Sequence, residues 1–481
     1  MSNRLGRAGS VVLLALLSAA GCAVDQKKEV DLYRRELDGP TPPPPVVLNA
    51  GEALTLARAM ALANQNNETL AISGEGYVQS LIDKVRAASG FLPTVSASAS
   101  HSISRSDSLS GQERTGHSTG ATLRGSVSIL DLKNFSDVKR AAATAEQQRL
   151  LLLNLQETVL LSVATTYYQV LRSERSVQVL ESSLKLQSER VRDMQARQTL
   201  GINKPLDLAQ AQANESGTRV QLYQARSNVR NARATLAFLI GVPGVDGPLD
   251  DHFQPPEPAA QPAEYERRAE MQRRDLLATA SGVEAAGHSV DTAVREYYPT
   301  FSLDVSQALY RNPDAGLLRS AVISAALPIF SAGLIHADVR AAWSRYRQSV
   351  LNQAQTRRQV HEDIEIAYEN LRASREQLKE LRTTVSAAQR AYDLATATYR
   401  LGSASNLDQL TALDALRNAQ LAQANEEFNE KVFYLDLLRA TGEFGPGTPD
   451  HLTPPAPPNQ PGPPMPAPAA ADQPSNGPGG S

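Results

Sequence analysis

The chain repeats itself at an interval of 201 residues, and this repeat constrains its fold more than any other feature. Five pairs of positions share the interval: Leu200-Gly201 with Leu401-Gly402, Leu206-Asp207 with Leu407-Asp408, Asp137-Val138 with Asp338-Val339, Tyr167 with Tyr368, and Gly241 with Gly442. The interval far exceeds a solenoid unit of roughly 20–50 residues. The pattern therefore indicates a duplicated half-protein, with repeats at 49–246 and 247–444.

Each half is predicted to contain the same elements in the same order. These are helices at about 52–88 and 264–295, strand pairs at about 93–130 and 299–330, long helices at 137–199 and 338–400, tips at about 200–207 and 401–408, and return helices at 206–240 and 407–441. Neither long helix contains proline or glycine. At about 1.5 Å per residue each would run roughly 90–100 Å. Gly201 and Gly402 follow them and predict C-terminal caps.

The predicted strands alternate between an apolar and a polar face. In Val95–Ser104 every even position is serine, and apolar side chains occupy odd positions: Val95, Ala97, Ala99 and Ile103. Ala121–Ile129 alternates in the same way. Period-two alternation is typical of a strand with one polar and one apolar face. The Gly/Ser-rich segment 105–120 predicts a hairpin loop, about five residues longer than its counterpart in the second repeat.

Such strands, of about ten residues, fit a transmembrane β-barrel. Four strands cannot close a barrel, and open edges in lipid leave backbone groups unpaired at several kcal/mol each. Three chains would supply twelve strands, enough for a water-filled lumen lined by the serine face. Aromatic residues at strand ends would form an interfacial girdle: Phe91, Tyr297, Tyr298 and Phe330. The alternative is a pair of short soluble hairpins that cap a coiled coil.

The N-terminal segment predicts a secreted, lipid-anchored protein. Arg4 and Arg7 precede a short apolar run, and small residues lead to the only cysteine, Cys22. This is the order of a signal peptide, at 1–21, and its end resembles a bacterial lipobox. Residues 22–48 would then be a lipidated N-terminus with a Pro-rich spacer, and 445–481 a disordered Pro-rich tail. The alternative is ordinary cleavage that leaves Cys22 as a chance thiol.

The duplicated order of elements resembles the TolC family of outer-membrane efflux channels, including its lipoprotein members. The matching stretches are "GFLPTVSAS" and "YYPTFSLDV" at the strand pairs, "LPIFSAG" before the long helix of the second repeat, and "LGSASNLDQLTALDALRNAQLAQANEEF" at the end of the second repeat. The resemblance covers about 49–444 and implies a mixed α/β membrane protein. Three chains would share a transmembrane β-barrel with four strands per chain and a long α-helical barrel, with a mixed equatorial domain partway along.

The resemblance also implies a location, partners and a function. The protein would be a homotrimer in the outer membrane of a double-membraned bacterium, extending into the periplasm. Cys22 would carry the lipid, such as palmitate, and Ala23 after it favours the outer membrane. An inner-membrane pump and a periplasmic adaptor would join the channel in a tripartite efflux or type I secretion system. The adaptor would dock on the tips, at Gly201, Lys204, Pro205, Gly402 and Asn406.

Asp207 and Asp408 allow two compatible readings. A carboxylate in the first turn of a helix is stabilised by the helix dipole, by roughly 0.3–1 kcal/mol. Alternatively, three copies of each would gather in a periplasmic constriction, as the resemblance implies, and raise each other's pKa. A second carboxylate of some family members is replaced here by Thr411, which should weaken such a constriction.

Tyr399 matches a tyrosine that helps to hold the tip closed in some relatives. The loop arginine that would pair with this tyrosine is replaced by Ala404, so Arg400 and Lys204 are the nearby candidates for its partner. Together with the two aspartates, Tyr399 and Arg400 complete the predicted periplasmic constriction.

No residue pattern predicts an enzyme or a cofactor. The seven histidines include no pair at helical metal-site spacing, and no phosphate-binding or dinucleotide glycine motif occurs. Charge is almost balanced, with 48 basic and 51 acidic residues, which argues against nucleic-acid binding. Two hypotheses remain: a passive export duct, and a periplasmic coiled-coil adaptor or structural envelope lipoprotein. They differ in whether the strands enter a membrane.

Overall fold

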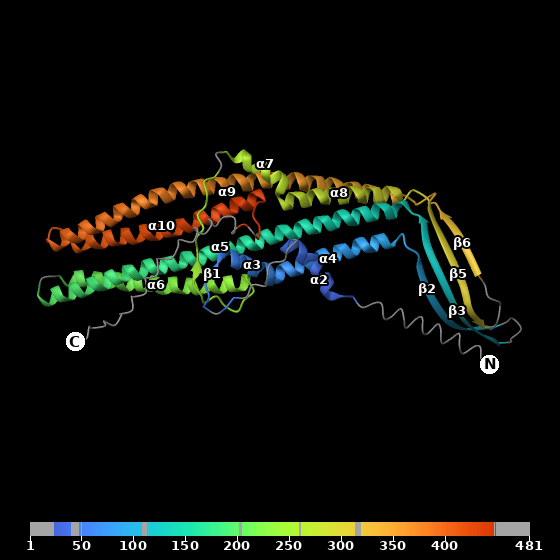
Figure 1. Ribbon diagram of the computed structural model, residues 1–481, viewed down its shortest axis with the longest axis horizontal. Helices are drawn as coiled ribbons and strands as arrows, with labels where there is room; N and C mark the ends of the chain where they lie inside the picture. Colours follow the sequence, from blue (N-terminus) through green and yellow to red (C-terminus); the bar gives the residue numbers. More distant parts are fainter. Residues whose placement is uncertain are drawn as a thin grey trace, which may run out of the picture.

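The computed structural model describes residues 24–39, 48–49, 51–107, 113–201, 204–258, 261–312, 319–446 and 448. The signal segment, Cys22 and most of the predicted Pro-rich tail lie outside the described residues. The described chain is an elongated rod of helices with strands at one end and two helical hairpin tips at the other (Figure 1).

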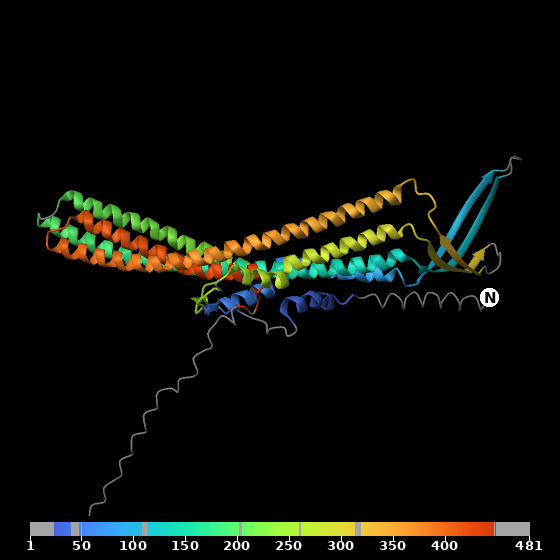
Figure 2. The ribbon, with the colours of Figure 1, turned by 90° about the horizontal axis from the view of Figure 1, so that it is seen from above.

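Each of the four strands of the main sheet is joined to one helix. The connected pairs are α4 (Glu68–Ser89) with β2 (Thr94–Asp107), β3 (Glu113–Leu130) with α5 (Leu132–Thr199), α8 (Arg274–Arg295) with β5 (Thr300–Asn312), and β6 (Arg319–Ala326) with α9 (Leu334–Arg400). The strands form one antiparallel sheet in the order β2-β3-β5-β6. The helices contact one another in the same order, so α4 and α9 lie at opposite sides of the helical layer (Figure 2).

The sheet register confirms the predicted alternation of faces. Ala97 pairs with Leu123 and Leu303 pairs with Ile323, so apolar side chains of neighbouring strands share one face. Serines share the other face, where the Ser102 and Ser118 hydroxyls lie 2.7 Å apart. Within the described residues β2 and β6 each pair on one side only, so the sheet has two open edges.

The predicted hairpin loop at 105–120 is wrong, because most of it is strand. β2 runs to Asp107 and β3 begins at Glu113. β3 has 18 residues, against 8 in β6, and the connections whose lengths the prediction compares, 108–112 and 313–318, lie outside the described residues. Glycine and serine locally favour turns, but here ladder pairing and side-chain bonds such as His101 Nδ1 to Thr119 Oγ1, 2.8 Å, continue the strands.

The long helices end where the sequence predicts, at Thr199 and Arg400, and begin four or five residues earlier than predicted. The return helices are α6 (Pro205–Leu239) and α10 (Asn406–Thr441). Each predicted first helix is in fact two: α3 (Leu56–Asn66) and α4, then α7 (Pro262–Gln272) and α8. Extended backbone at Asn67 and Arg273 breaks them. By composition α5 includes one stretch that could cross a membrane, but nearly half of it is buried against other parts of the chain.

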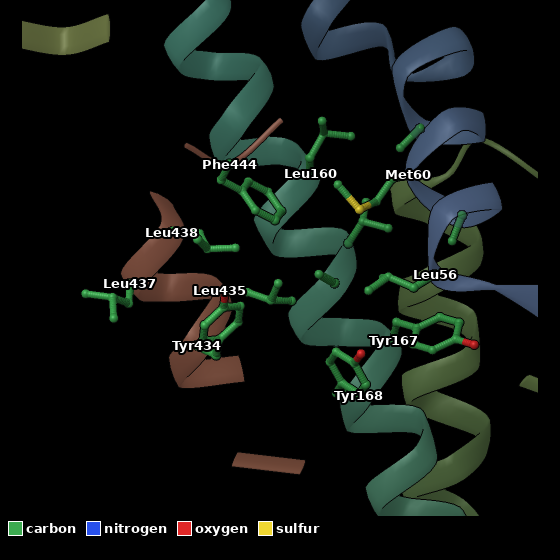
Figure 3. Packing of buried hydrophobic residues seen from close by; sticks show 14 of the residues in the cluster. Leu56, Met60, Leu160, Tyr167, Tyr168, Tyr434, Leu435, Leu437, Leu438 and Phe444 are labelled. Carbon is green, nitrogen blue, oxygen red and sulfur yellow. The ribbon is translucent and has the colours of Figure 1, made fainter. Parts of the chain in front are cut away.

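The main hydrophobic core lies at mid-length, where both repeats meet. Tyr167 and Tyr168 of α5 are fully buried beside Leu435 of α10 (Figure 3). The Tyr167 hydroxyl lies 2.8 Å from the Leu54 carbonyl oxygen and 2.7 Å from that of Asp250. These carbonyls belong to the short parallel pair β1 (Leu54–Thr55) and β4 (Leu249–Asp250), so α5 contacts the starting segments of both repeats.

A helix that the sequence reading did not predict, α2 (Gln26–Asp38), lies within the assumed spacer. Its buried Tyr33 packs over Gly74 of α4, where any Cβ would come within 2.4 Å of the ring. Arg34 donates to the Asn64 carbonyl at 2.8 Å, and Asn64 donates to Asp38 at 2.8 Å. The N-terminal segment is therefore docked on the helical layer rather than being only a spacer.

Candidate functional site

The two hairpin tips lie at the end of the molecule opposite the sheet (Figure 1). Gly201 and Gly402 end the long helices with φ of +74° and +77°. The Gly201 amide donates to the Gln198 carbonyl at 2.9 Å, and the Gly402 amide donates to the Tyr399 carbonyl at 3.0 Å. A left-handed residue after the last helical turn is most easily supplied by glycine. The predicted glycine caps are confirmed.

The second tip starts its return helix with a complete capping box. The Asp408 amide donates to Ser405 Oγ at 3.2 Å, and the Ser405 amide donates to Asp408 Oδ2 at 2.8 Å. The Ser405 hydroxyl also donates to Oδ2, at 2.7 Å, and this bond is the main reason that the pKa of the Asp408 carboxyl is lowered. The helix-start reading thus accounts for Asp408, and the constriction reading, which needs three copies, stays a prediction.

The first tip lacks this cap. Lys204 stands at the N-cap without a side-chain bond, and Pro205 opens the helix. Asp207 lies in the first turn, with its amide 3.0 Å from the Lys204 carbonyl. Among the described residues its carboxylate accepts no hydrogen bond. The equivalent aspartates therefore sit in different chemical surroundings.

The two hairpins are joined at the tips by Arg190 of α5, which the sequence reading missed. Its side chain is buried, and Nη2 donates to the Asn406 carbonyl at 3.0 Å and to the Asn406 side-chain oxygen. Asn406 Nδ2 in turn donates to the Asp207 carbonyl at 3.3 Å. Arg190, Asn406 and Asp207 thereby connect α5, α10 and α6; together with Tyr399 we name these residues the cross-hairpin cluster.

Tyr399 completes the cross-hairpin cluster. The guanidinium carbons of Arg190 and Arg197 each lie 5.5 Å from its ring centroid, a distance at which cations interact favourably with aromatic faces. Its hydroxyl lies 3.5 Å from the buried sulfur of Met194. Arg190, Met194 and Arg197 are spaced i, i+4 and i+7 on α5, a single helical face that a closer reading of the sequence could have found.

Two opposing effects act on the pKa of Arg190. Burial lowers the pKa of its guanidinium, while Tyr399, Asp193 and Asp207 act in the opposite direction. Arginine nevertheless stays charged in proteins. Among the described residues, its Nε and Nη1 atoms find no hydrogen-bond acceptor. An incompletely paired buried cation costs free energy, which offsets part of what its bonds to Asn406 contribute.

Three sequence-based assignments need correction. Arg400 and Lys204, the candidate partners of Tyr399, are both exposed, and the arginines that meet its ring come instead from α5. Asn406, predicted to contact an adaptor, is only 5 % exposed and is bound by Arg190. The other predicted docking positions are exposed: Gly201, Lys204, Pro205 and Gly402.

Across the part of the chain that the structure describes, no group of three or more His, Cys, Asp or Glu side chains could hold a metal ion. His361 lies 2.8 Å from Glu266 and 3.9 Å from Glu365, and His252 lies 3.1 Å from Asp250.

Comparison with known proteins places both repeats in one family. The family model of the outer membrane efflux protein matches residues 60–242 and again 267–443. The outer membrane efflux protein BepC of Brucella suis is 27% identical over 399 residues, which cover 81% of this chain and 86% of that protein. Outer membrane protein TolC of Escherichia coli is 22% identical over 344 residues, covering 68% of this chain and 70% of TolC.

Solved structures show the same fold. The outer membrane protein VceC from Vibrio cholerae superposes with a TM-score of 0.71 at 19% identity, over 80% of this chain and 96% of VceC. BepC is named an outer membrane efflux protein and TolC an outer membrane protein, so the second hypothesis from the sequence, a periplasmic adaptor or structural lipoprotein, is not supported.

Proposed function

Because the chain belongs to the outer membrane efflux protein family, we propose that it is a passive, trimeric exit duct of a tripartite efflux or type I secretion system. The duct would lead from a periplasmic adaptor and an inner-membrane pump to the outside of the cell. The pump would supply the energy, and this chain would supply the path.

The observation that carries the proposal is the incompleteness of the single chain. Among the residues that the structure describes, the sheet is open at β2 and β6, and the helical layer beneath it is open on the same two sides, at α4 and α9. Pairing β6 of one copy with β2 of the next would place α9 beside α4 of that copy. A strand edge left in lipid costs several kcal/mol for each unpaired group. Three copies would close both layers, giving twelve strands above twelve helices.

At the tips, the proposal assigns a gate to the cross-hairpin cluster and a docking surface to the exposed turns. Three copies of Asp207 and Asp408 would line the narrow end, where carboxylates favour cations over anions. The exposed Gly201, Lys204, Pro205 and Gly402 would meet the adaptor. Contacts that pull the hairpins apart would have to break the bonds of Arg190 to Asn406.

A lipid on Cys22 fits the direction of α2. Tyr33 lies over Gly74, and Asp38 contacts Asn64, so α2 runs opposite to α4. Because α4 leads into the sheet, the N-terminal end of α2 points toward the proposed membrane. Gln26 begins α2 four residues after Cys22, a short tether to the lipid surface. Several acyl chains on one cysteine would anchor the protein firmly, where one chain binds only marginally.

The test is assembly followed by conductance. The purified mature protein should migrate as a heat-sensitive trimer and should form cation-preferring channels in a planar bilayer. The Asp207→Asn, Asp408→Asn double variant should lose part of the cation preference while remaining trimeric. A water-soluble monomer without sheet signal in detergent or lipid would overturn the proposed function.

A further inference from the structure

A groove lies where three helices approach the sheet. It is lined by Phe135 and Lys139 from the first turns of α5, by Arg295 and Tyr298 at the end of α8, and by Trp343 of α9. Its volume of about 690 Å³ is large enough for a drug-sized ligand or a lipid headgroup. Phe135, Tyr298 and Trp343 are 49%, 51% and 45% exposed, so three large aromatic side chains border it without being covered.

The charges around this groove are mostly positive. Lys139 and Arg295 line it, and Trp343 separates it from a second hollow on α9 that contains Arg340 and Arg347. Within the described ranges, Lys139, Arg340 and Arg347 form no ion pair. The one acidic lining residue, Asp291, lies 3.4 Å from His288 Nδ1. Two cations and one carboxylate therefore line the groove, and two further cations line the hollow beside it.

The groove lies next to the layer of lipid headgroups if the sheet spans the membrane. Lys139 is seven residues into α5, or about 10 Å from the helix start. The headgroup layer is roughly 5–8 Å thick on each side of the bilayer, so the Lys139 backbone lies just beyond it. Because α5 and α9 begin at the sheet, the side chains of Lys139 and Trp343 lean toward the membrane.

The groove also belongs to the outer face of the helical layer. Trp343 and Tyr368 are 25 residues apart on α9, close to seven full turns, so they share one face. Tyr368 packs against Tyr265 of α7, with ring centroids 6.2 Å apart. In the proposed trimer the helical layers of three copies form a closed ring around the tunnel. If α7 lay on the inner face of this ring it would narrow the tunnel, so the face of α9 that contacts α7 is the outer one. The copies would join at the edges of the layer, with α9 of one copy beside α4 of the next, so the outer face would stay uncovered.

We propose that the groove binds one anionic phospholipid of the periplasmic leaflet. Its phosphate would lie between Lys139 and Arg295, and an acyl chain would lie along Phe135 and Trp343 toward the sheet. Basic side chains provide the charge complementarity, and amphipathic aromatics suit an interface of this kind. This inference rests on the proposed placement of the sheet in the outer membrane.

Trp343 is the only tryptophan among the 481 residues, so tryptophan fluorescence reports on this one position, which borders the groove and the neighbouring hollow. The full mature protein would be placed in nanodiscs containing phosphatidylglycerol or phosphatidylcholine with bromine atoms on their acyl chains, which quench tryptophan on contact. Brominated phosphatidylglycerol should quench at several-fold lower mole fraction than brominated phosphatidylcholine. Lys139→Gln should reduce this preference about fivefold, since one basic side chain at the surface contributes about 1 kcal/mol.

The matched control is Lys84→Gln, because Lys84 is an exposed lysine near the membrane end of α4 but outside the groove. It should keep the full preference, and Trp343→Phe should remove the signal. Equal quenching by the two lipids, or equal losses in both lysine variants, would overturn the proposal. Trimers that insert without any quenching would show that another copy covers the groove, which also overturns it. Failure to insert or to form trimers would instead count against the proposed function.

Discussion

The two hairpin tips occupy equivalent places in the repeat and are built differently. Ser405 caps its return helix and is tied to Asp408, whereas Lys204 at the equivalent place makes no cap. Asn406 is buried under Arg190, whereas its equivalent, Pro205, is exposed. The turns themselves agree, with glycine at φ of +74° and +77°.

This difference shows which part of a duplicated structure is free to diverge. The turn needs a left-handed residue, so both copies keep glycine. The first helical turn has several ways to satisfy its amides, so its residues can acquire separate tasks. The second tip uses its polar side chains to hold the hairpins together, and the first leaves its side chains available at the surface.

Removing Arg190 should have the largest effect on this asymmetry. Arg190→Ala deletes the bonds to Asn406 and one cation beside Tyr399, and hydrogen bonds to charged groups contribute about 1.5–3 kcal/mol each. The free energy of opening at the second tip should fall by at least the contribution of one such bond, about 1.5–3 kcal/mol. Hydrogen exchange of the first-turn amides of α10 would measure this loss. Channel conductance should rise with it.

Arg192→Ala is the control, since Arg192 is an exposed arginine two residues away on α5. Equal protection in both variants would mean that Arg190 does not hold the tip. Arg190→Met separates packing from hydrogen bonding, because it keeps an apolar contact for Tyr399. Protection above that of the natural protein in this variant would show that the buried cation is a net cost.

Exchanging the equivalent residues Asn406 and Pro205 for alanine should sharpen the comparison. Asn406→Ala leaves the Arg190 guanidinium with one partner fewer in a buried place, at about 1–3 kcal/mol. Pro205→Ala changes an exposed first-turn residue and should cost less than about 0.5 kcal/mol. Limited proteolysis at each tip measures both. A double-mutant cycle of Arg190→Ala with Asn406→Ala should give a coupling of about 1–2 kcal/mol, and additive losses would contradict the contact.

Changing the caps should have a smaller effect, of opposite sign at the two tips. Ser405→Ala should destabilise the start of α10 by about 1 kcal/mol, the usual contribution of an N-cap side chain. Lys204→Ser should stabilise the start of α6 by a similar amount, because Asp207 already stands three residues later, where a capping box needs it. Exchange rates of first-turn amides in both helices test this. No gain in α6 would show that Pro205 prevents the box.

The sequence predicted the features that depend on local chemistry. Glycine at Gly201 and Gly402 ends the long helices because only this residue type adopts positive φ easily. Alternation in Val95–Ser104 predicted the two faces of β2, because strand side chains point to opposite sides. The pattern from Ser405 to Asp408 also predicts a capping box, a local signal that was available and passed over.

The sequence could not predict what depends on how the hairpins pack. Arg190 and Asn406 are 216 positions apart, and only the packing of α5 beside α10 brings them together. Helix α2 contains just two buried residues, Tyr33 and Leu37, in a charged stretch, too weak a pattern without Gly74 beneath it. Strand length in the first hairpin likewise depends on pairing between β2 and β3 rather than on composition.

Acid should produce the smallest difference between the tips. The Ser405 hydroxyl and amide lower the pKa of Asp408 below its ordinary value of 3.8. A lowered pKa in the folded state means that the cap is fully present above that ordinary value and is lost only as the pH falls through the lower one. Neutral and mildly acidic solutions should therefore leave the second tip unchanged.

Carboxyl-carbon NMR of monomeric and assembled protein tests this and the constriction together. In the monomer Ser405→Ala should move the Asp408 midpoint up toward the ordinary value. In the trimer the same titration measures how closely the copies approach, because crowded carboxylates raise each other's pKa. An Asp408 midpoint above the ordinary value there would mean that repulsion between copies outweighs the cap. A midpoint that stays low would place the three Asp408 side chains too far apart to form a constriction.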